Sequence, residues 1–497
     1  MKYPVTFIRE NIVYDAEEGV TLLEAERLAG LTPDAPCGGN GKCGKCRVLV
    51  DGVSLAACQV LVTKAMNVDT GAGKEGANQI LTEGAKSRVE LAPGELPEDV
   101  ERPFLAAVDL GSTSVVVYLL DGKTGETLAV RSMLNPQRQY GADVVMRASY
   151  AMEHGAEALS SCIRRLVGEM IRELARECGG TQEDVVRIVM VGNSCMHHLF
   201  LEIPVDSLVL APYEPKVKDA VTYSAQELGM QAHPAAKLSW LPNIGGFVGA
   251  DTVGCILATH MEEREKMTLM IDIGTNGEMV LGNRATGLTA CSTAAGPAFE
   301  GAKISCGMRG STGAIDHVYL DGGGHMTWHV IGEGEPIGIC GSGLLDAAAC
   351  LLKNGTVDES GRMEADWHFT ENVSLLQQDI RELQLAKAAI AAGIRILCTK
   401  KGIEVGDIEE VLIAGAFGNY LDPESACDIG MLPEELRGRI TSVGNAAGEG
   451  ARIAALNESE YERSRILARE VEFIELAREA DFQDVYVDEL EFPEQED

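Results

Sequence analysis

Four cysteines near the start of the chain have a spacing suited to holding a metal. Cys37, Cys43, Cys46 and Cys58 follow a C-x5-C-x2-C-x11-C pattern, whereas the other ten of the fourteen cysteines are scattered over the rest of the chain. Glycines separate the first three of them (CGGNGKCGKC). Glycine lets a loop wrap closely around a metal cluster with its backbone amides turned toward sulfur. We therefore expect these four thiolates to be metal ligands.

The pattern resembles the C-x4-C-x2-C…C loop of plant-type [2Fe–2S] ferredoxins, with one more residue in the first gap. The short last gap fits a hairpin, VLVDGVSLAAC. The resemblance implies a [2Fe–2S] cluster on the four cysteines and a β-grasp ferredoxin-like domain over residues 1–80. A four-cysteine zinc site is the alternative, but such sites usually contain two C-x2-C pairs and this segment contains one.

Two further motifs place an aspartate at the end of an apolar run. Asp109 lies in LAAVDLGSTSVVVYLL and Asp272 in TLMIDIGTNGEMVL. Glycine in such a turn admits phosphate close to the backbone, hydroxyls and amides donate to phosphate oxygens, and aspartate can hold Mg²⁺ or orient an attacking water. We expect Asp109 and Asp272 to be catalytic. The residues expected to bind nucleotide phosphates in these turns are Gly111, Ser112, Thr113, Gly274, Thr275 and Asn276.

The two motifs form an internal repeat whose aspartates lie 163 positions apart in the sequence. A repeated strand–turn–strand unit implies two related α/β lobes. Strands expected at 185–191 and 410–414, with helices at 156–178, 341–352 and 377–398, complete these lobes. The sequence contains no GxxxxGK[ST] motif, so we expect the phosphate-binding site not to be of the P-loop type.

The paired motifs resemble the superfamily of actin, Hsp70, sugar kinases and acetate kinase, in which two phosphate motifs face each other across a cleft. Further segments over 105–460 match in the expected order: GGFVGADTVG (245–254) and GNAAGEGARIAA (444–455) as connecting helices, and GAFGN (415–419) as the adenosine loop. The resemblance implies a multidomain α/β protein with a two-lobed actin-like (RNase H-like) ATPase. Its lobes are expected at 105–262 and 263–497, after a proline-rich linker at 81–104 that would let the first domain move.

Additional nucleotide contacts are expected in the second lobe. On the expected helix 377–398, Gln384 and Lys387 are three residues apart and share a face. That face either contacts the adenine or ribose of the nucleotide or is solvated. The resemblance adds the residues Gly341, Ser342, Gly343, Gly415, Ala416, Phe417 and Gly418.

A [2Fe–2S] domain fused to this ATPase is similar to the reductive activators of corrinoid-dependent methyltransferase systems. The strings that carry this resemblance are VGNSCMHHLF (191–200), NIGGFVGADTVG (243–254), ACSTAAGPAFEGAKISCGMRG (290–310), GICGSGLLD (338–346), DIRELQLAKAAI (379–390) and IAGAFGNYLD (413–422). The resemblance implies ATP- and Mg²⁺-dependent transfer of one electron from the cluster to Co(II), which regenerates Co(I) for methyl transfer.

The implied partners are a corrinoid protein and an external low-potential electron donor, and a homodimer is possible. We expect the loop with Ser292 and Thr293 to meet the corrinoid. Longer family members carry a middle domain between ferredoxin and ATPase, and with only 50 residues between Cys58 and Asp109 we expect it to be absent. Two alternatives remain: an activator of 2-hydroxyacyl-CoA dehydratase type, which donates electrons to another acceptor, and a redox-regulated small-molecule kinase.

Composition restricts the class of protein further. The chain has 497 residues, 45% hydrophobic and 24% charged, which is ordinary for a globular protein with a large core. The net charge of −34 argues against nucleic-acid binding, because neutralising phosphates requires lysine and arginine. No run approaches 18 apolar residues, so we expect no membrane span. The first twenty residues include charges where a signal peptide needs an apolar run, so we expect no signal peptide and a cytoplasmic location.

Overall fold

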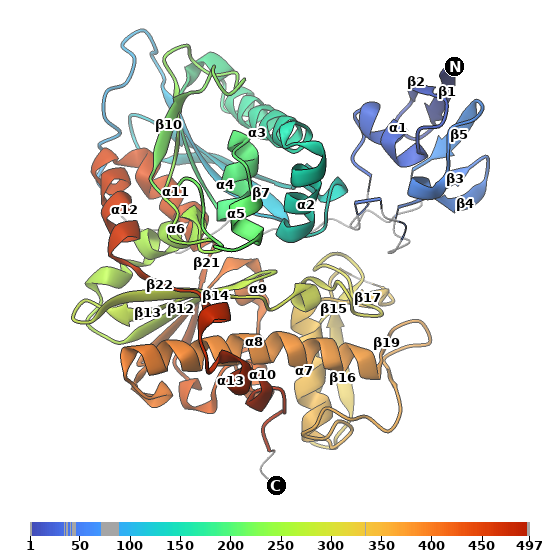
Figure 1. Cartoon of the computed structure of the whole chain (residues 1–497), viewed down its shortest axis with the longest axis vertical. Helices are drawn as coiled ribbons and strands as arrows, with labels where there is room; N and C mark the ends of the chain where they lie inside the picture. The colour runs from blue at the N-terminus through green and yellow to red at the C-terminus, as the bar shows by residue number, and fades with distance from the viewer. Residues whose placement is uncertain are drawn as a thin grey trace.

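A computed structural model describes residues 2–33, 35, 38–39, 41, 46–70, 89–332 and 334–494, without the side chain of Ala416. Figure 1 shows a small N-terminal unit beside the upper of two larger lobes. Cys37, Cys43 and residues 81–88 of the expected linker lie outside the described residues. Within the described part of the chain, no helix is both long and apolar enough to span a bilayer.

The N-terminal unit is a five-stranded sheet of order β2-β1-β5-β3-β4, with one helix. Alternating side chains bury Val5 and Phe7 on one face, and Thr21 caps the helix by accepting from the Glu24 amide. Its elements are β1 (Lys2–Phe7), β2 (Ile12–Glu17), α1 (Leu22–Leu28), β3 (Arg47–Val50), β4 (Val53–Ala56), η1 (Ala57–Gln59) and β5 (Met66–Asp69).

The upper lobe is built on a six-stranded sheet of order β10-β11-β9-β6-β7-β8. Its inner strands are apolar on both faces because helices cover them, as in β6, where six of seven residues are buried. The strands are β6 (Phe104–Leu110), β7 (Ser114–Asp121), β8 (Thr127–Leu134), β9 (Val185–Gly192), β10 (Val221–Ser224) and β11 (Lys237–Trp240). The helical elements are η2 (Pro136–Gln139), α2 (Val144–His154), α3 (Glu157–Glu177), η3 (Gln182–Asp184), α4 (Ser194–Leu201), α5 (Asp206–Val209), α6 (Ala250–Thr259) and η4 (Met261–Glu263).

The lower lobe repeats this design in a sheet of order β21-β20-β12-β13-β14-β22. The strands are β12 (Thr268–Ile273), β13 (Gly277–Asn283), β14 (Gly287–Thr293), β20 (Glu410–Ala414), β21 (Ile440–Gly444) and β22 (Glu472–Ile474), with β15 (Ala314–Leu320), β16 (Met326–Val330), β17 (Gly338–Ile339), β18 (Trp367–His368) and β19 (Ser374–Leu375) in smaller sheets. The helical elements in this half of the sequence are η5 (Pro297–Glu300), α7 (Gly341–Lys353), α8 (Gln377–Lys401), η6 (Val405–Asp407), α9 (Gly415–Tyr420), α10 (Pro423–Asp428), η7 (Glu434–Leu436), α11 (Ala446–Leu456), α12 (Glu458–Glu470), η8 (Leu476–Arg478) and α13 (Phe482–Asp488).

The predicted internal repeat is confirmed by the strand pairing of the two large sheets. In each, three strands form an antiparallel meander: β6-β7-β8 in one and β12-β13-β14 in the other. A crossover strand then pairs parallel to the first strand, β9 beside β6 and β20 beside β12, and the next strand again pairs parallel. The two Asp-containing strands are therefore the equivalent central strands of two related sheets.

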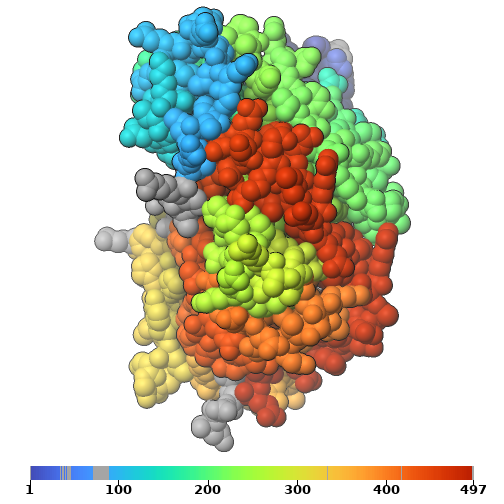
Figure 2. Space-filling model, turned by 90° about the vertical axis from the view of Figure 1, so that its left-hand side faces the viewer, coloured from blue at the N-terminus to red at the C-terminus, as the bar shows by residue number. Residues whose placement is uncertain are grey.

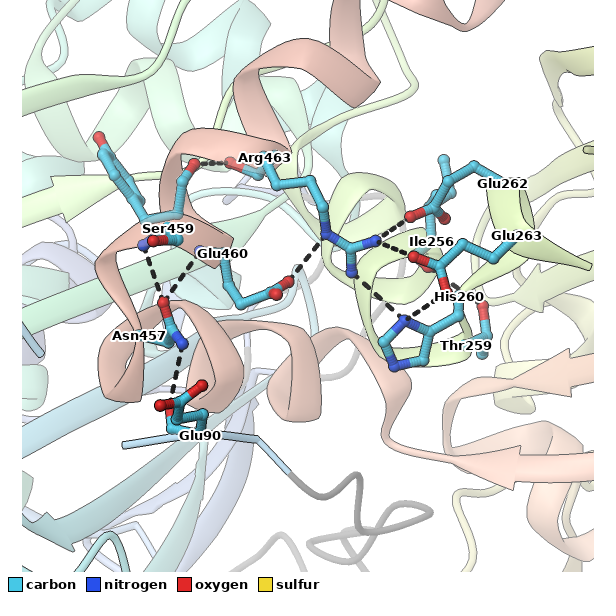
Figure 3. A network of polar contacts seen from close by, with 12 residues as sticks. Glu90, Ile256, Thr259, His260, Glu262, Glu263, Asn457, Ser459, Glu460 and Arg463 are labelled. Carbon is cyan, nitrogen blue, oxygen red and sulfur yellow. Dashed lines mark hydrogen bonds and ion pairs between the residues drawn. The ribbon is translucent and has the colours of Figure 1, made fainter. Parts of the chain in front are cut away.

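Helices α11 and α12 follow the lower sheet in sequence but pack in the upper lobe. Ala451, Ile453 and Leu467 belong to the hydrophobic core that surrounds β6 and β9. Figure 2 shows these C-terminal residues in red beside the blue and cyan upper lobe. Polar contacts fix α12 there: Arg463 pairs with Glu262 and Glu263 of η4 and with Glu460, at the centre of a network that also includes His260 (Figure 3).

The second half of the expected linker is not a free tether. Val89, Leu91, Leu96 and Val100 pack on the upper core. The backbone is tied as well, because Asn457 Nδ2 donates to the Glu90 carbonyl at 2.9 Å (Figure 3). The prediction of a mobile linker over 81–104 is therefore wrong for residues 89–103, since their apolar side chains pack against the lobe.

The N-terminal unit also contacts the upper lobe directly. The Arg27 guanidinium donates to the Gln139 carbonyl and lies 4.9 Å from the centre of the Tyr140 ring. Arg27 is buried in this contact, with 8% of its side chain exposed. A cation over an aromatic face contributes about 0.5–2 kcal/mol, more when desolvated. The N-terminal domain was expected to move freely, but it has a docking contact with the upper lobe.

We expect Arg27→Ala to weaken this docking, because the substitution removes both the hydrogen bond and the ring contact. Small-angle X-ray scattering of the full chain should show a larger radius of gyration. Arg47→Ala is the matched control, since Arg47 belongs to the same N-terminal unit, on β3, and its guanidinium donates to Ser54 Oγ of β4 within that unit. A scattering profile of Arg27→Ala identical to that of the parent would show that this contact does not hold the unit in place.

Candidate functional site

The two Asp–Gly–Thr turns meet in one cavity of about 300 Å³ between the lobes. The turn after β6 contributes from above and the turn after β12 from below, because both strands point their carboxyl ends at the same gap. The lining residues that the motifs predicted are Asp109, Gly111, Ser112, Thr113, Asp272, Gly274, Thr275, Asn276, Gly341, Ser342, Gly415 and Phe417. The structure therefore brings together two sets of residues that lie 163 positions apart in the sequence.

A backbone hydrogen bond closes each of the two turns. The Gly111 amide donates to the Ser114 carbonyl at 2.9 Å, and the Gly274 amide donates to the Asn276 carbonyl at 2.8 Å. A Cβ atom at Gly111 would sit 2.9 Å from that Ser114 oxygen, so a larger residue does not fit without a shift. Asn193, the N-cap of α4, donates to Ser112 Oγ at 2.9 Å and holds the first turn from the side.

The two aspartates are positioned by different neighbours. Asn445, which caps α11, donates through Nδ2 to Asp109 Oδ2 at 2.9 Å. Asp272 lies against Gly415, whose φ of +85° and closeness to Asp272 Oδ1 leave no room for a Cβ atom. Burial raises the pKa of Asp272 to about 6. Burial also raises the pKa of Asp109 to about 7, although the Asn445 hydrogen bond opposes the rise and Asp272 adds to it.

The cavity lining is strongly acidic. Burial raises the pKa of both Asp251, in the first turn of α6, and Glu278, on β13, and the neighbouring carboxylates raise them further. The lining contains six carboxylates and one guanidinium: Asp109, Asp251, Asp272, Glu278, Glu300 and Asp316, with Arg309. Oxygen donors in this arrangement suit a hard divalent cation, and a phosphate chain could enter only with such a cation.

Asp251, Glu278 and Glu300 were not predicted from the sequence. Asp251 and Glu278 lie inside the motifs GADTVG and GTNGE. Their positions within those motifs could have indicated that they face the site. Glu278 stands directly opposite Asp272 in the β12–β13 register, so it points to the same face of the sheet. Asp251 begins a helix that follows a glycine, where a carboxylate faces into the gap between the lobes. Glu300 carries no comparable local signal, because its place depends on the loop after β14.

The remaining predicted residues of the second lobe have mixed placements. Phe417 stacks on Phe299 with 4.9 Å between ring centres, and both line the cavity. Gly343 and Gly418 support the site from behind, packed against the Ile315 carbonyl and the Ile413 side chain. The side chain of Ala416 lies outside the described residues.

Gln384 and Lys387 do not reach the cavity, which argues against their predicted contact with adenine or ribose. The other predicted possibility, a solvated face, is excluded by burial: they are 3% and 1% exposed. A C-terminal segment at 490–492, here called the strap, covers both side chains. Gln384 Nε2 donates to the Leu490 carbonyl at 2.9 Å, and Lys387 donates to the Glu491 carbonyl. Sequence periodicity could show that they share a face but not that residues 100 positions later would bury it.

Ser292 and Thr293 end β14, one strand away from the Asp272 turn. Ser292 Oγ donates to Glu278 Oε1 at 3.4 Å, so it lies behind a carboxylate of the cavity. Thr293 is 3% exposed, and its hydroxyl has no hydrogen-bond partner among the described residues. Their expected contact with a corrinoid stays a prediction.

The two described cysteines of the N-terminal cluster lie close together. Cys46 precedes β3 and Cys58 lies in η1, and their Sγ atoms are 3.3 Å apart. The hairpin β3–β4 brings them together across the eleven-residue gap, as the sequence predicted. Two thiolates at this separation can serve as ligands of one metal centre.

Comparisons with known proteins assign the large lobes. A family model described as the RACo middle region matches residues 104–264, and one described as the C-terminal domain of RACo, the ASKHA domain, matches residues 266–497. The family's middle region is therefore present in this chain, whereas the expected absence concerned a separate domain between the ferredoxin-like domain and the ATPase. The matched middle region is not an insertion ahead of the ATPase but forms the upper lobe itself, from β6 to η4.

Relatives agree with these models. The corrinoid activation enzyme RamQ of Eubacterium limosum is 38% identical over 420 residues, covering 78% of this chain and 70% of RamQ. The [Co(II) methylated amine-specific corrinoid protein] reductase of Methanosarcina barkeri is 28% identical over 430 residues, covering 78% of this chain and 76% of that protein. A solved structure named reductive activator for corrinoid,iron-sulfur protein superposes with a TM-score of 0.73 at 28% identity, covering 99% of each chain. The chain belongs to the RACo family of reductive activators of corrinoid proteins.

Proposed function

We propose that this protein uses ATP to reduce the Co(II) form of a corrinoid protein to Co(I). The observation that carries the proposal is the meeting of the two Asp–Gly–Thr turns in one acidic cavity, in a chain whose relatives are named for corrinoid activation. MgATP would bind in this cavity, with its phosphates on the two turns and its adenosine toward Phe417. The corrinoid protein is the substrate-bearing partner, and an external low-potential donor resupplies the electron.

The residues of the cavity fit a Mg²⁺ ion. Four carboxylates face the gap: Asp109, Asp251, Asp272 and Glu278. Burial raises the pKa of each, and for all but Asp272 a neighbouring carboxylate raises the pKa further. Such pKa values are typical of carboxylates that have no cation beside them. Mg²⁺ prefers such oxygen ligands together with substrate phosphates. A bound cation would neutralise this repulsion and let the polyanionic nucleotide approach.

The N-terminal unit fits a [2Fe–2S] cluster. Cys46 and Cys58 lie 3.3 Å apart, and the sheet order β2-β1-β5-β3-β4 with one helix supports a β-grasp, ferredoxin-like fold. Cys37 and Cys43 would complete the ligand set. A cluster of this type, when bound, supplies one electron near −400 mV.

ATP is needed because reduction to Co(I) is uphill from that potential. Each 100 mV costs about 2.3 kcal/mol per electron. Binding can supply this free energy only if the nucleotide, and the corrinoid protein, have different affinities for two arrangements of the lobes. The cavity lies between the lobes and takes its lining from both, so its occupancy is suited to favour one arrangement.

A prediction for the nucleotide site concerns hydrolysis. Asp109→Asn and Asp272→Asn should each lower MgATP hydrolysis at least about 100-fold, since each removes a carboxylate expected to hold Mg²⁺ or to orient water. Both variants should also lose the rise in melting temperature that Mg²⁺ gives the parent. Asp219→Asn is the control, because Asp219 pairs with Arg469 on the surface. Parent-like hydrolysis by both cavity variants would refute the assigned site.

A prediction for the N-terminal unit concerns the metal. Protein purified without oxygen should be brown and contain about two iron atoms per chain. Cys46→Ser should lose or alter the visible absorbance, whereas Cys178→Ser, in the upper lobe, should retain it. Iron analysis and electron paramagnetic resonance of the dithionite-reduced protein check both. A colourless parent that holds stoichiometric zinc would favour the zinc alternative.

A further inference from the structure

One carboxylate links the two phosphate turns to each other. Glu300, the last residue of η5, accepts through Oε1 from Thr113 Oγ1 at 3.1 Å and from Thr275 Oγ1 at 3.0 Å. Thr113 belongs to the turn of the upper lobe and Thr275 to the turn of the lower lobe. A single carboxylate oxygen thus bridges the lobes through the two hydroxyls that the turns offer to phosphate.

This bridge and a bound phosphate exclude each other. Each threonine hydroxyl has one proton to donate, so it cannot donate to Glu300 and to a phosphate oxygen together. The carboxylate and the phosphate also carry like charges, which repel strongly at contact distance in a partly buried site. A nucleotide whose phosphates occupy the two turns must therefore displace Glu300.

Two glycines bound the short segment that carries Glu300. Gly296 and Gly301 flank η5 with φ angles of +77° and +74°, a region that favours glycine. Phe299 lies between them and stacks on Phe417 in the cavity wall. Beyond Gly301 the chain is anchored again, because the Ser305 amide donates to Asp379 Oδ1 of α8 at 2.8 Å.

A buried cation near the bridge offers the displaced carboxylate a partner. Arg147 of α2 is 0% exposed, and its Nη2 has no hydrogen-bond partner among the described residues. Burial lowers the pKa of the Arg147 guanidinium to about 10, and the negative charge of Glu300 is among those that oppose this lowering. The same segment of chain, from Gln139 to Arg147, carries the docking contact of the N-terminal unit, so a change at Arg147 lies close to that contact.

We propose that Glu300 is a positioning residue that senses the nucleotide. In the nucleotide-free protein its carboxylate holds the two turns together, and nucleotide phosphates take over both threonine hydroxyls and release the segment 296–301. This inference rests on the proposed binding of MgATP in the cavity. Glu300 would then convert phosphate binding into a conformational change of the loop that follows Ser292 and Thr293.

The test compares Glu300→Gln and Glu300→Ala with the parent as full-length protein. Calorimetric titration with Mg²⁺ and the non-hydrolysable ATP analogue AMP-PNP should give a Kd about tenfold lower for both variants, because no anion has to be displaced. Glu382→Gln is the matched control. Its carboxylate pairs with Lys303 three residues beyond Glu300 and contacts neither threonine, so its Kd should stay within twofold of the parent.

Hydrogen exchange provides a readout that a merely structural role would not give. In the parent, AMP-PNP should increase amide exchange in residues 296–304, because the bridge is released. In Glu300→Ala this exchange should be high already without nucleotide and change little on binding. Melting temperatures of the variants verify that they fold, and Glu300→Gln keeps the shape of the side chain if alanine does not.

The outcomes separate the two proposals. Parent-like or weaker AMP-PNP binding by folded Glu300 variants, or nucleotide-induced protection of 296–304 in the parent, would overturn the role of Glu300 while leaving the nucleotide site intact. A parent that binds no AMP-PNP would instead overturn the proposed function and this inference with it.

Discussion

Repulsion among carboxylates at the junction of the two lobes governs the rest of the structure. Asp109 and Asp251 from above and Asp272 and Glu278 from below face one gap, and burial raises the pKa of each. The surrounding elements hold these charges in place rather than neutralising them. Asn445 donates to Asp109, and Gly415 leaves space for Asp272. A cation and a phosphate chain would complete such a site. Because both lobes line it, the arrangement of the lobes would depend on whether these ligands are bound.

The connections between the units are arranged around this junction. Helices α11 and α12 leave the lower sheet and pack into the upper core, so the chain crosses between the lobes more than once. Asn445 stands at the crossing and contacts the upper aspartate from the start of α11. The N-terminal unit docks through Arg27 on the segment that leads into α2, and α2 contributes Val144 to the cavity wall. A change at the nucleotide therefore has a short route to the cysteine-bearing unit.

Much of this architecture could be predicted from local patterns. The Asp109 and Asp272 motifs predicted two related sheets, because a strand, a glycine turn and a second strand are specified by neighbouring residues. The helices at 157–177 and 377–401 were expected within three residues of their observed ends, since their apolar periodicity is long and regular. The Cys46–Cys58 approach also followed from a hairpin signal.

The errors came from contacts between distant segments. Gln384 and Lys387 have a polar side-chain pattern that is compatible with a ligand face, yet the strap at 490–492 buries them. Residues 89–103 looked like a linker because of their prolines and charges, and only their packing on the upper core shows otherwise. Glu300 was missed for the same reason, because its two partners come from turns 187 and 25 residues away in the sequence.

The most direct test of the central claim is to mix the reduced protein with a Co(II) corrinoid protein of a methyltransferase system and to follow the Co(I) absorbance band. The account predicts Co(I) formation that requires both MgATP and an intact Cys46, and ATP hydrolysis that rises when the Co(II) protein is added. Co(I) formation at the same rate and extent without nucleotide, or ATP turnover indifferent to every corrinoid protein tested, would contradict it.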